Sequence, residues 1–179
     1  MPELSPPVER VHESFLAAMA EFRAEGRGVP DDNSMIGHDL RTYGDTWADP
    51  DTFARYVADT RAQALEETPR PEHFVPSTTL WLIDGDEYLG RVAIRHRLNQ
   101  HLLDEGGHIG YDVRPTARRR GHATAMLRGA LIVAKELGIE PALLTCDTTN
   151  TVSRRVIEAA GGVLEDERNG KLRFWVPVG

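Results

Sequence analysis

The sequence predicts a single α/β domain with a mixed, mostly antiparallel central sheet and helices on both faces. Three observations support this prediction. Apolar residues recur at helical spacing in some segments and at strand spacing in others. Two turn signals, Asp84-Gly85-Asp86 and Asn169-Gly170, each join consecutive strand-like segments as a hairpin, which excludes a purely parallel sheet. A chain of 179 residues is long enough to bury one sizeable core.

The first 75 residues are predicted to be helical. Residues 8–24 place apolar side chains on one helical face. Asp49-Pro50 is typical of an N-cap followed by proline at the first helical position, and opens a helix that runs to about residue 66. Residues 26–37 form a turn-rich connection, and residues 68–76 form a short proline-rich linker.

An acidic stretch lies at residues 30–50, between the two predicted helices. Such a run is usually a solvated loop, although it could attract a cation. Its carboxylates belong to Asp31, Asp32, Asp39, Asp45 and Asp49.

The rest of the chain alternates strands and helices. Strands are expected at residues 78–83, 87–97, 108–113, 142–146, 163–165 and 172–176, and helices at about 123–137 and 150–160. Residues 99–107 are expected to be a loop.

Residues 108–124, His-Ile-Gly-Tyr-Asp-Val-Arg-Pro-Thr-Ala-Arg-Arg-Arg-Gly-His-Ala-Thr, form the central motif. Pro115 lacks a backbone donor and should end the strand. A helix then begins near Ala123, so a strand passes through a short arginine-rich and glycine-containing turn into a helix N-terminus. The free amides and the dipole of that terminus favour an anion, and Arg118, Arg119 and Arg120 add charge. The alternative is an ordinary connection with solvated arginines.

The spacing of this motif resembles a known family. Arg118-x-x-Gly121-x-Ala123, shortly after Val113-x-Pro115, resembles the acetyl-CoA signature of the GNAT superfamily of N-acetyltransferases. A second block, Asn150-x-x-Ser153 followed by Val156-Ile157 and Gly161-Gly162, resembles the closing Asn-led helix of that superfamily. Residues 75–79, 94–99 and 106–111 are most similar to a bacterial branch of predicted acetyltransferases. The resemblance covers about residues 75–166.

The resemblance implies direct transfer of an acetyl group from acetyl-CoA to an amine. It implies a helical acceptor-side part at residues 1–75 and an acetyl-CoA-binding core at residues 76–179. The backbone of Tyr111 and Val113 would pair with the pantetheine arm, with the Val113 N–H pointing at the thioester carbonyl. Asn150 would face the pantetheine or the reacting end. The amides that would hold the pyrophosphate belong to Arg118, Arg119, Arg120, Gly121, His122, Ala123 and Thr124.

The acid and base are less clearly marked. Several branches of the family place a Glu or His base early in the central strand. The corresponding positions of this chain hold Gly107 and Ile109, and the candidate bases are their neighbours Glu105 and His108. His108 could equally be a packed strand histidine. The tyrosine that many members use as general acid is replaced by Ile157, so Ser153 is nominated as the acid. Ser153 could instead satisfy helix backbone or contact CoA without proton transfer.

Composition excludes several other classes of protein. The single cysteine, Cys146, permits no internal disulfide and is expected to be a buried small residue. No metal-ligand spacing, nucleotide loop, signal peptide or membrane span is present, so a cytoplasmic location and no metal are expected. The net charge of −7 disfavours nucleic acid.

The remaining alternatives concern activity and partners. The acceptor is expected to be a small-molecule or peptide amine, and a homodimer is a family-level expectation. A catalytically inactive CoA-binding sensor or structural subunit is the alternative to an enzyme. An arginine-based nucleic-acid module is a weaker third hypothesis, and it predicts salt-sensitive binding.

Overall fold

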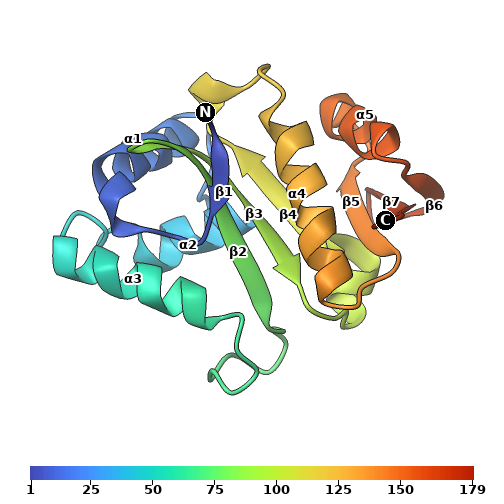
Figure 1. Ribbon diagram of the computed structural model, residues 1–179, viewed down its shortest axis with the longest axis horizontal. Helices are drawn as coiled ribbons and strands as arrows, with labels where there is room; N and C mark the ends of the chain where they lie inside the picture. Colours follow the sequence, from blue (N-terminus) through green and yellow to red (C-terminus); the bar gives the residue numbers. More distant parts are fainter.

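A seven-stranded sheet runs through the middle of the molecule in the computed structural model, which describes residues 1–179 (Figure 1). The strand order is β1-β2-β3-β4-β5-β7-β6. The strands are β1 (Glu3–Ser5), β2 (Ser77–Asp84), β3 (Glu87–Arg95), β4 (Ile109–Val113), β5 (Ala142–Asp147), β6 (Val163–Arg168) and β7 (Lys171–Val176). Every neighbouring pair is antiparallel except β4 and β5, which are parallel. The predicted mixed, mostly antiparallel sheet is confirmed.

Helices cover both faces of the sheet, as predicted (Figure 1). One face carries α1 (His12–Ala24), α2 (Met35–Tyr43) and α3 (Pro50–Ala62), and the other carries α4 (His122–Glu136) and α5 (Thr151–Ala159). Three short helical segments, η1 (Glu9–Val11), η2 (Leu102–Gly106) and η3 (Pro115–Ala117), complete the chain.

Each face of the sheet has its own hydrophobic core. The core under α1, α2 and α3 is aromatic, and Phe15 stacks on or meets edge-on the rings of Trp47, Trp81 and Tyr88. The core under α4 and α5 is aliphatic, and it contains the apolar face of α4, including Met126 and Leu127.

The helix α2 lies where the sequence predicts only loop, so that expectation was wrong. Ser34 caps α2 by accepting the Gly37 N–H at 3.0 Å, and Ile36 and Leu40 are buried four residues apart. Asp39 is also part of this helix, and its carboxylate binds the buried Arg91 at 2.8 Å rather than facing solvent. The acidic composition predicted a solvated loop, but Asp39 pairs with the buried Arg91 and belongs to a short amphipathic helix.

Other differences lie at element ends and in loops. The third helix ends at Ala62 and β3 ends at Arg95, each a few residues before the predicted end. The expected loop 99–107 contains η2, a single π-helical turn. β1 is an edge strand of three residues, and it is defined only by its pairing with β2.

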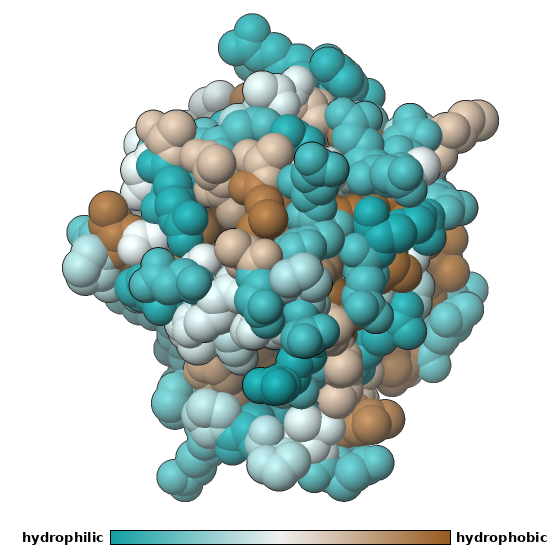
Figure 2. Space-filling view, turned by 90° about the vertical axis from the view of Figure 1, so that its left-hand side faces the viewer, coloured by the Kyte–Doolittle hydropathy of each residue, from teal (hydrophilic) through white to brown (hydrophobic).

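The face formed by the N-terminal helices is mostly hydrophilic, with hydrophobic residues scattered over it (Figure 2). None of the helices combines the length and the hydropathy needed to cross a lipid bilayer.

Candidate functional site

The β5-facing edge of β4 is left without a partner in the middle of the sheet. Hydrogen bonds from Arg95 N–H to the His108 carbonyl (2.7 Å) and from Arg114 N–H to the Leu89 carbonyl (2.8 Å) fix which residues of the β4 segment pair with β3. Because main-chain groups alternate along a strand, the N–H and C=O of Tyr111 and Val113 face the opposite way, toward β5. β5 pairs with β4 only at Ile109 and Leu144.

The two parallel strands therefore separate beyond Ile109, toward their C-terminal ends. A strand edge with free donors and acceptors binds an extended ligand by adding it as a further strand. The gap between β4 and β5 thus offers main-chain pairing to a linear molecule with amide groups.

A second set of free amides follows directly after β4. Arg119 (φ 66°) and Gly121 (φ 80°) both have left-handed backbone conformations within the loop that precedes α4. The first hydrogen bond of α4 runs from Ala125 N–H to the Gly121 carbonyl at 3.1 Å, and no side chain caps the helix. No acceptor is present for the amides of Arg119, Arg120 and Gly121, nor within the helix for those of His122, Ala123 and Thr124.

This run of amides can attract an anion. Left-handed residues within a turn direct successive N–H groups toward one point, and the dipole of α4 adds partial positive charge there. Arg118 is the exception in the series, since its amide donates to the Pro115 carbonyl at 3.4 Å. The predicted anion-binding turn thus has unpaired main-chain amides at the N-terminus of α4.

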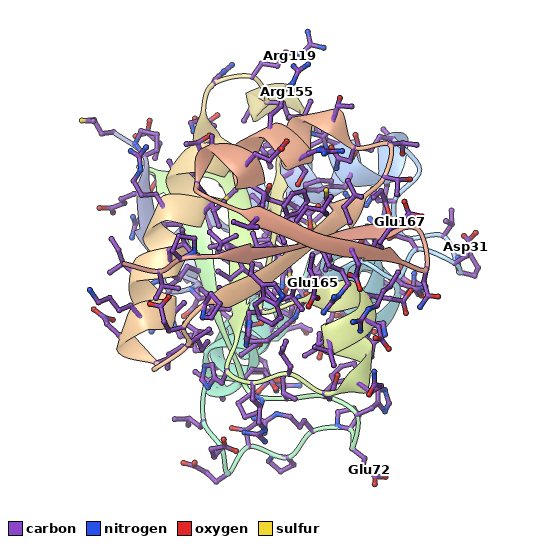
Figure 3. All side chains as sticks on the ribbon, turned by 90° about the vertical axis from the view of Figure 1, so that its right-hand side faces the viewer. Asp31, Glu72, Arg119, Arg155, Glu165 and Glu167 are labelled. Carbon is purple, nitrogen blue, oxygen red and sulfur yellow. The ribbon has the colours of Figure 1, made fainter.

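The arginines around the loop differ in what they bind. The guanidinium of Arg118 makes two 2.8 Å hydrogen bonds to Glu25, which ties the loop to the end of α1. Arg119 and Arg120 are exposed and form no ion pair. Arg119 and Arg155 project from the same end of the molecule, the first from the loop and the second from α5 (Figure 3). Positive charge therefore remains available at that end.

A groove of about 240 Å³ lies between α4 and α5. It begins at Thr124, the last of the free amides, and is mostly apolar apart from Arg128. Its other lining residues are Leu127, Leu131, Val156, Ala159 and Ala160. The groove offers a mostly apolar surface directly beside the loop of free amides.

On the α5 side of the gap, two hydroxyls meet. The Tyr111 hydroxyl lies 2.8 Å from Ser153 Oγ, so β4 and α5 are joined by this hydrogen bond. Burial raises the pKa of the Tyr111 phenol, although its hydrogen bond to Ser153 opposes the shift. Ile157 is fully buried in the aliphatic core and offers no polar atom. Asn150 Oδ1 caps α5 by accepting the Ser153 N–H at 3.0 Å.

The opposite face of β4 carries a half-buried carboxylate. Asp112 stands between Tyr111 and Val113, and its Oδ1 accepts a 3.1 Å hydrogen bond from Arg27. Burial raises the pKa of the Asp112 carboxyl above its ordinary value, although Arg27 and Arg91 oppose the shift. Sequence reasoning missed Asp112. Strand alternation was the available signal. Successive side chains of a strand lie on opposite faces of the sheet, so the side chain of Asp112 must lie on the face opposite to that of Tyr111 and Val113.

Arg27 connects this carboxylate to the loop between α1 and α2. Arg27 Nε also lies 3.3 Å from the Asp32 carboxylate. Burial acts against ionisation of Asp32, but hydrogen bonds from the Ser34 side chain and from the Gly28 and Ser34 amides lower the pKa of Asp32 to about 2. Asp32 is therefore a fixed anion that holds Arg27 in place, not a cation-binding residue of a solvated loop.

The two bases that the sequence nominated lie at the other end of the strand. Glu105 is on η2 and its carboxylate contacts His101 at 3.4 Å, with 37% of the side chain exposed. His108 is buried, and its Nδ1 accepts the Leu143 N–H at 2.9 Å. Burial and then the charge of Arg95 lower the pKa of His108. This geometry keeps the imidazole neutral and favours the packed strand histidine over the base.

The bonding of His108 predicts a pH effect on stability. The folded pKa lies below the ordinary value of about 6.5. Below that pH the unfolded chain takes up a proton that the folded chain does not, so the unfolding free energy falls, by at most about 1.4 kcal/mol per pH unit. Chemical denaturation should show that the unfolding free energy falls less between pH 7 and pH 5 in His108→Gln than in the wild type. His101→Gln, at an exposed histidine, should behave as the wild type.

Other chemistry is poorly supported by the structure. Cys146 is free and buried in the aliphatic core, and burial raises the pKa of its thiol, which disfavours a thiolate nucleophile. His96 bonds Thr78 Oγ1 at 2.8 Å, away from the gap. No group of three or more His, Cys, Asp or Glu side chains has the geometry to hold a metal ion.

Comparisons with known proteins identify the family and agree with the fold. A family model described as acetyltransferase (GNAT) domain matches residues 34–163. RimJ of Mycobacterium smegmatis, solved in complex with CoA-disulfide, superimposes with a TM-score of 0.67 at 17% identity, over 98% of this chain and 81% of that chain. The PaiA N-acetyltransferase from Thermoplasma acidophilum, in complex with coenzyme A, gives a TM-score of 0.60 at 12% identity, over 99% of each chain.

A third similar structure is the microcin C7 self-immunity acetyltransferase MccE in complex with acetyl-CoA and AMP. Its TM-score is 0.60 at 11% identity, over 98% of this chain and 92% of that chain. No curated protein sequence matches this chain. At these identities, the likeness to the solved structures concerns the fold.

Proposed function

The chain belongs to the GNAT family of acetyltransferases, whose model covers well over half of it, and from this premise we propose that it transfers an acetyl group from acetyl-CoA to a primary amine. Family membership confirms the resemblance seen in the motifs around Gly121 and Asn150. The acceptor and the catalytic residues form the proposal that follows.

One observation carries the proposal: free main-chain groups of β4 lead directly into the free amides before α4. Acetyl-CoA has amide groups in its pantetheine arm and a diphosphate beyond it, in the same linear order. The β4 edge at Tyr111 and Val113 would pair with the arm, and the amides from Arg119 to Thr124 would bind the diphosphate. Arg155 and the groove between α4 and α5 would meet the nucleotide end.

Distance along β4 decides which amide faces the thioester. Val113 is next to the diphosphate loop, whereas Tyr111 lies two residues deeper in the gap. We therefore assign the Tyr111 N–H to the thioester carbonyl, in place of the Val113 N–H expected from the sequence, and the Val113 backbone to the arm. A preorganised N–H aimed at a developing oxyanion typically contributes about 3 kcal/mol to transition-state stabilisation.

The amine must lose a proton before or during attack. A lysine-like amine with a pKa of about 10.4 is mostly protonated at pH 7, so a nearby base lowers the barrier. Asp112 is the carboxylate that directly follows Tyr111 in β4, on the face that the N-terminal part covers, and burial raises the pKa of its carboxyl above the ordinary value, as suits a base. Asp112 therefore replaces Glu105 and His108 as our proposed base.

The departing thiolate lies on the other face, where Ser153 and Tyr111 meet. We propose Ser153 as the general acid, as expected from the sequence. The Tyr111 hydroxyl is hydrogen-bonded to Ser153 Oγ, as donor or as acceptor. Base and acid then act from opposite faces of β4. This arrangement separates the incoming amine from the outgoing thiol, as direct transfer requires.

Removing the hydroxyls should slow turnover without weakening CoA binding. We expect Ser153→Ala and Tyr111→Phe each to lower kcat by about tenfold. This loss is smaller than the loss expected when a general acid assists a poor leaving group, because a thiol with a pKa near 8.5 leaves readily. Steady-state kinetics and calorimetry with CoA measure the two effects. Val152→Ala, at an exposed neighbour on α5, serves as the control. Full kcat in both hydroxyl variants would contradict the acid role.

The proposed function is tested by measuring thiol release from acetyl-CoA with a panel of amines. The panel contains small amines, amino acids, aminoglycosides and peptides with free N-termini. Amine-dependent release, with the acetylated product identified by mass spectrometry, supports the transferase. Tight CoA binding with no turnover on any amine would identify an inactive CoA-binding protein instead.

The N-terminal part is proposed to line the acceptor side. Arg27, Asp32 and Met35 belong to it and lie against the face of β4 that carries Gly110 and Asp112. This agrees with an acceptor-side part at residues 1–75 and a CoA-binding core at residues 76–179.

A further inference from the structure

We propose that the acceptor carries a carboxylate next to its amine, as a free amino acid does, and that Arg95 binds this carboxylate. The inference rests on the proposed transferase function and names the substrate class of the same site.

Arg95 lies beside the position of acetyl transfer. It is the last residue of β3, and its side chain covers Gly110 of β4. Its two terminal guanidinium nitrogens lie 3.4 and 3.6 Å from the position that a Cβ on Gly110 would occupy. Gly110 directly precedes Tyr111, whose N–H faces the gap, so a group bound to Arg95 lies next to the acceptor side of the thioester.

The charge of Arg95 has no partner in the chain. Its Nη1 donates to the carbonyls of Gly106 at 2.9 Å and Gly107 at 3.3 Å, but no carboxylate lies within 4.0 Å. The other arginines that contact this face differ, because each binds at least one carboxylate. Arg27 pairs with Asp112 and Asp32, Arg91 with Asp39, and Arg173 with Glu165 and Asp166.

Two donors of Arg95 remain open. Nε and Nη2 form no hydrogen bond, yet they are absent from the set of fully buried side-chain atoms without partners, which consists of Trp47 Nε1, Trp81 Nε1, Tyr88 Oη and Arg91 Nε. Nε and Nη2 are therefore not completely buried, and in the proposed complex they bind the carboxylate of the ligand. These two N–H groups are parallel and match the two oxygens of a carboxylate.

The surroundings favour an anion at this place. Burial and then the neighbouring Arg91 lower the pKa of Arg95 to about 10, so Arg95 is still a cation at neutral pH. A partly buried cation without a counter-ion is costly, and a bound carboxylate offsets the cost. Asp112 lies two residues beyond Gly110 on the same face of β4. A molecule with its carboxylate on Arg95 can thus present its amine to Asp112.

The test compares amino acids with matched compounds that lack the carboxylate. Each amino acid is assayed beside its C-terminal amide and its decarboxylated amine, in the wild type, Arg95→Gln and Arg95→Lys. We expect the wild type to favour the acid over the amide by at least tenfold in kcat/KM. Arg95→Gln should bring this ratio near one through a higher KM for the acid, and Arg95→Lys should retain part of the preference because it keeps the charge but not the paired donors.

Arg70→Gln is the matched control. Arg70 is also partly buried and bonds main-chain carbonyls and Gln63 rather than a carboxylate, but it lies in the linker before β2. It should keep the wild-type preference. Melting curves and CoA titration of each variant separate a loss of fold from a loss of recognition, and Arg95→Lys decides the question if Arg95→Gln does not fold.

Equal rates with acids and amides in the wild type, or an undiminished preference in Arg95→Gln, would overturn the inference and leave the transferase standing. If no amine is acetylated although CoA binds, the proposed function fails. The role of Arg95 is then tested by calorimetry, which measures whether the CoA-saturated protein binds N-acetyl amino acids. Binding that Arg95→Gln abolishes supports it, and no binding overturns it.

Discussion

Gly121→Glu should raise the Kd for CoA at least about 100-fold, which corresponds to about 2.7 kcal/mol. The new carboxylate would stand among the free amides before α4 and repel the diphosphate. The fold should tolerate the change, because a Cβ on Gly121 meets no atom within 4 Å and a negative charge at a helix N-terminus is favourable. Calorimetry with CoA measures the effect.

Gly138→Glu is the control for this substitution. Gly138 follows the other end of α4, has the same φ of 80°, and a Cβ placed on it would likewise meet no atom within 4 Å. It therefore carries the same backbone strain of about 1 kcal/mol but lies far along the helix from the loop. CoA binding should be normal in Gly138→Glu. Normal binding in Gly121→Glu would remove the basis for the assigned diphosphate site.

Asp112→Asn should lower kcat/KM by about 100-fold or more while CoA binding stays intact, since a general base typically contributes a factor of this size. Asparagine has the same shape and can still accept the hydrogen bond from Arg27, but it cannot take a proton at neutral pH. Steady-state kinetics with the best acceptor from the amine panel provide the measurement.

Arg27→Gln separates catalysis from structure in this test, because it breaks the same ion pair and leaves the carboxylate in place. Burial raises the pKa of Asp112 and Arg27 holds it down, so removing Arg27 should raise the pKa further. A base must be unprotonated to act, and the acidic limb of the pH profile should therefore move to higher pH. If Arg27→Gln loses as much activity as Asp112→Asn at every pH, Asp112 has only a structural role.

The local motifs determined much of the site. Pro115, the arginine-rich turn and the apolar spacing after Ala123 are short-range signals, and they predict the strand, the loop and the helix N-terminus that supply the free amides. The pairing direction of the hairpins was also local, because Asp84-Gly85-Asp86 and Asn169-Gly170 each close over a few residues. Such features need no knowledge of distant residues.

The acidic N-terminal stretch shows where local reasoning fails. Asp39 is typical of a solvated loop by its neighbours, yet Arg91, more than fifty residues away, draws it into a buried ion pair and α2 forms around it. Glu105 and His108 were nominated by their place before the central strand. Only the packing of β5 showed that His108 accepts the Leu143 N–H.

The sequence alone determined the family, the sheet class and the position of the loop that we propose binds the diphosphate, because each depends on residues close together in the chain. The tertiary structure decided which groups meet on the two faces of β4: Tyr111 meets Ser153 of α5 on one face, and Asp112 meets Arg27 from the loop after α1 on the other. It also showed that Arg95 lacks a counter-ion over Gly110. These are contacts between distant segments, and the burial that sets their pKa values exists only once the two cores have closed on the sheet.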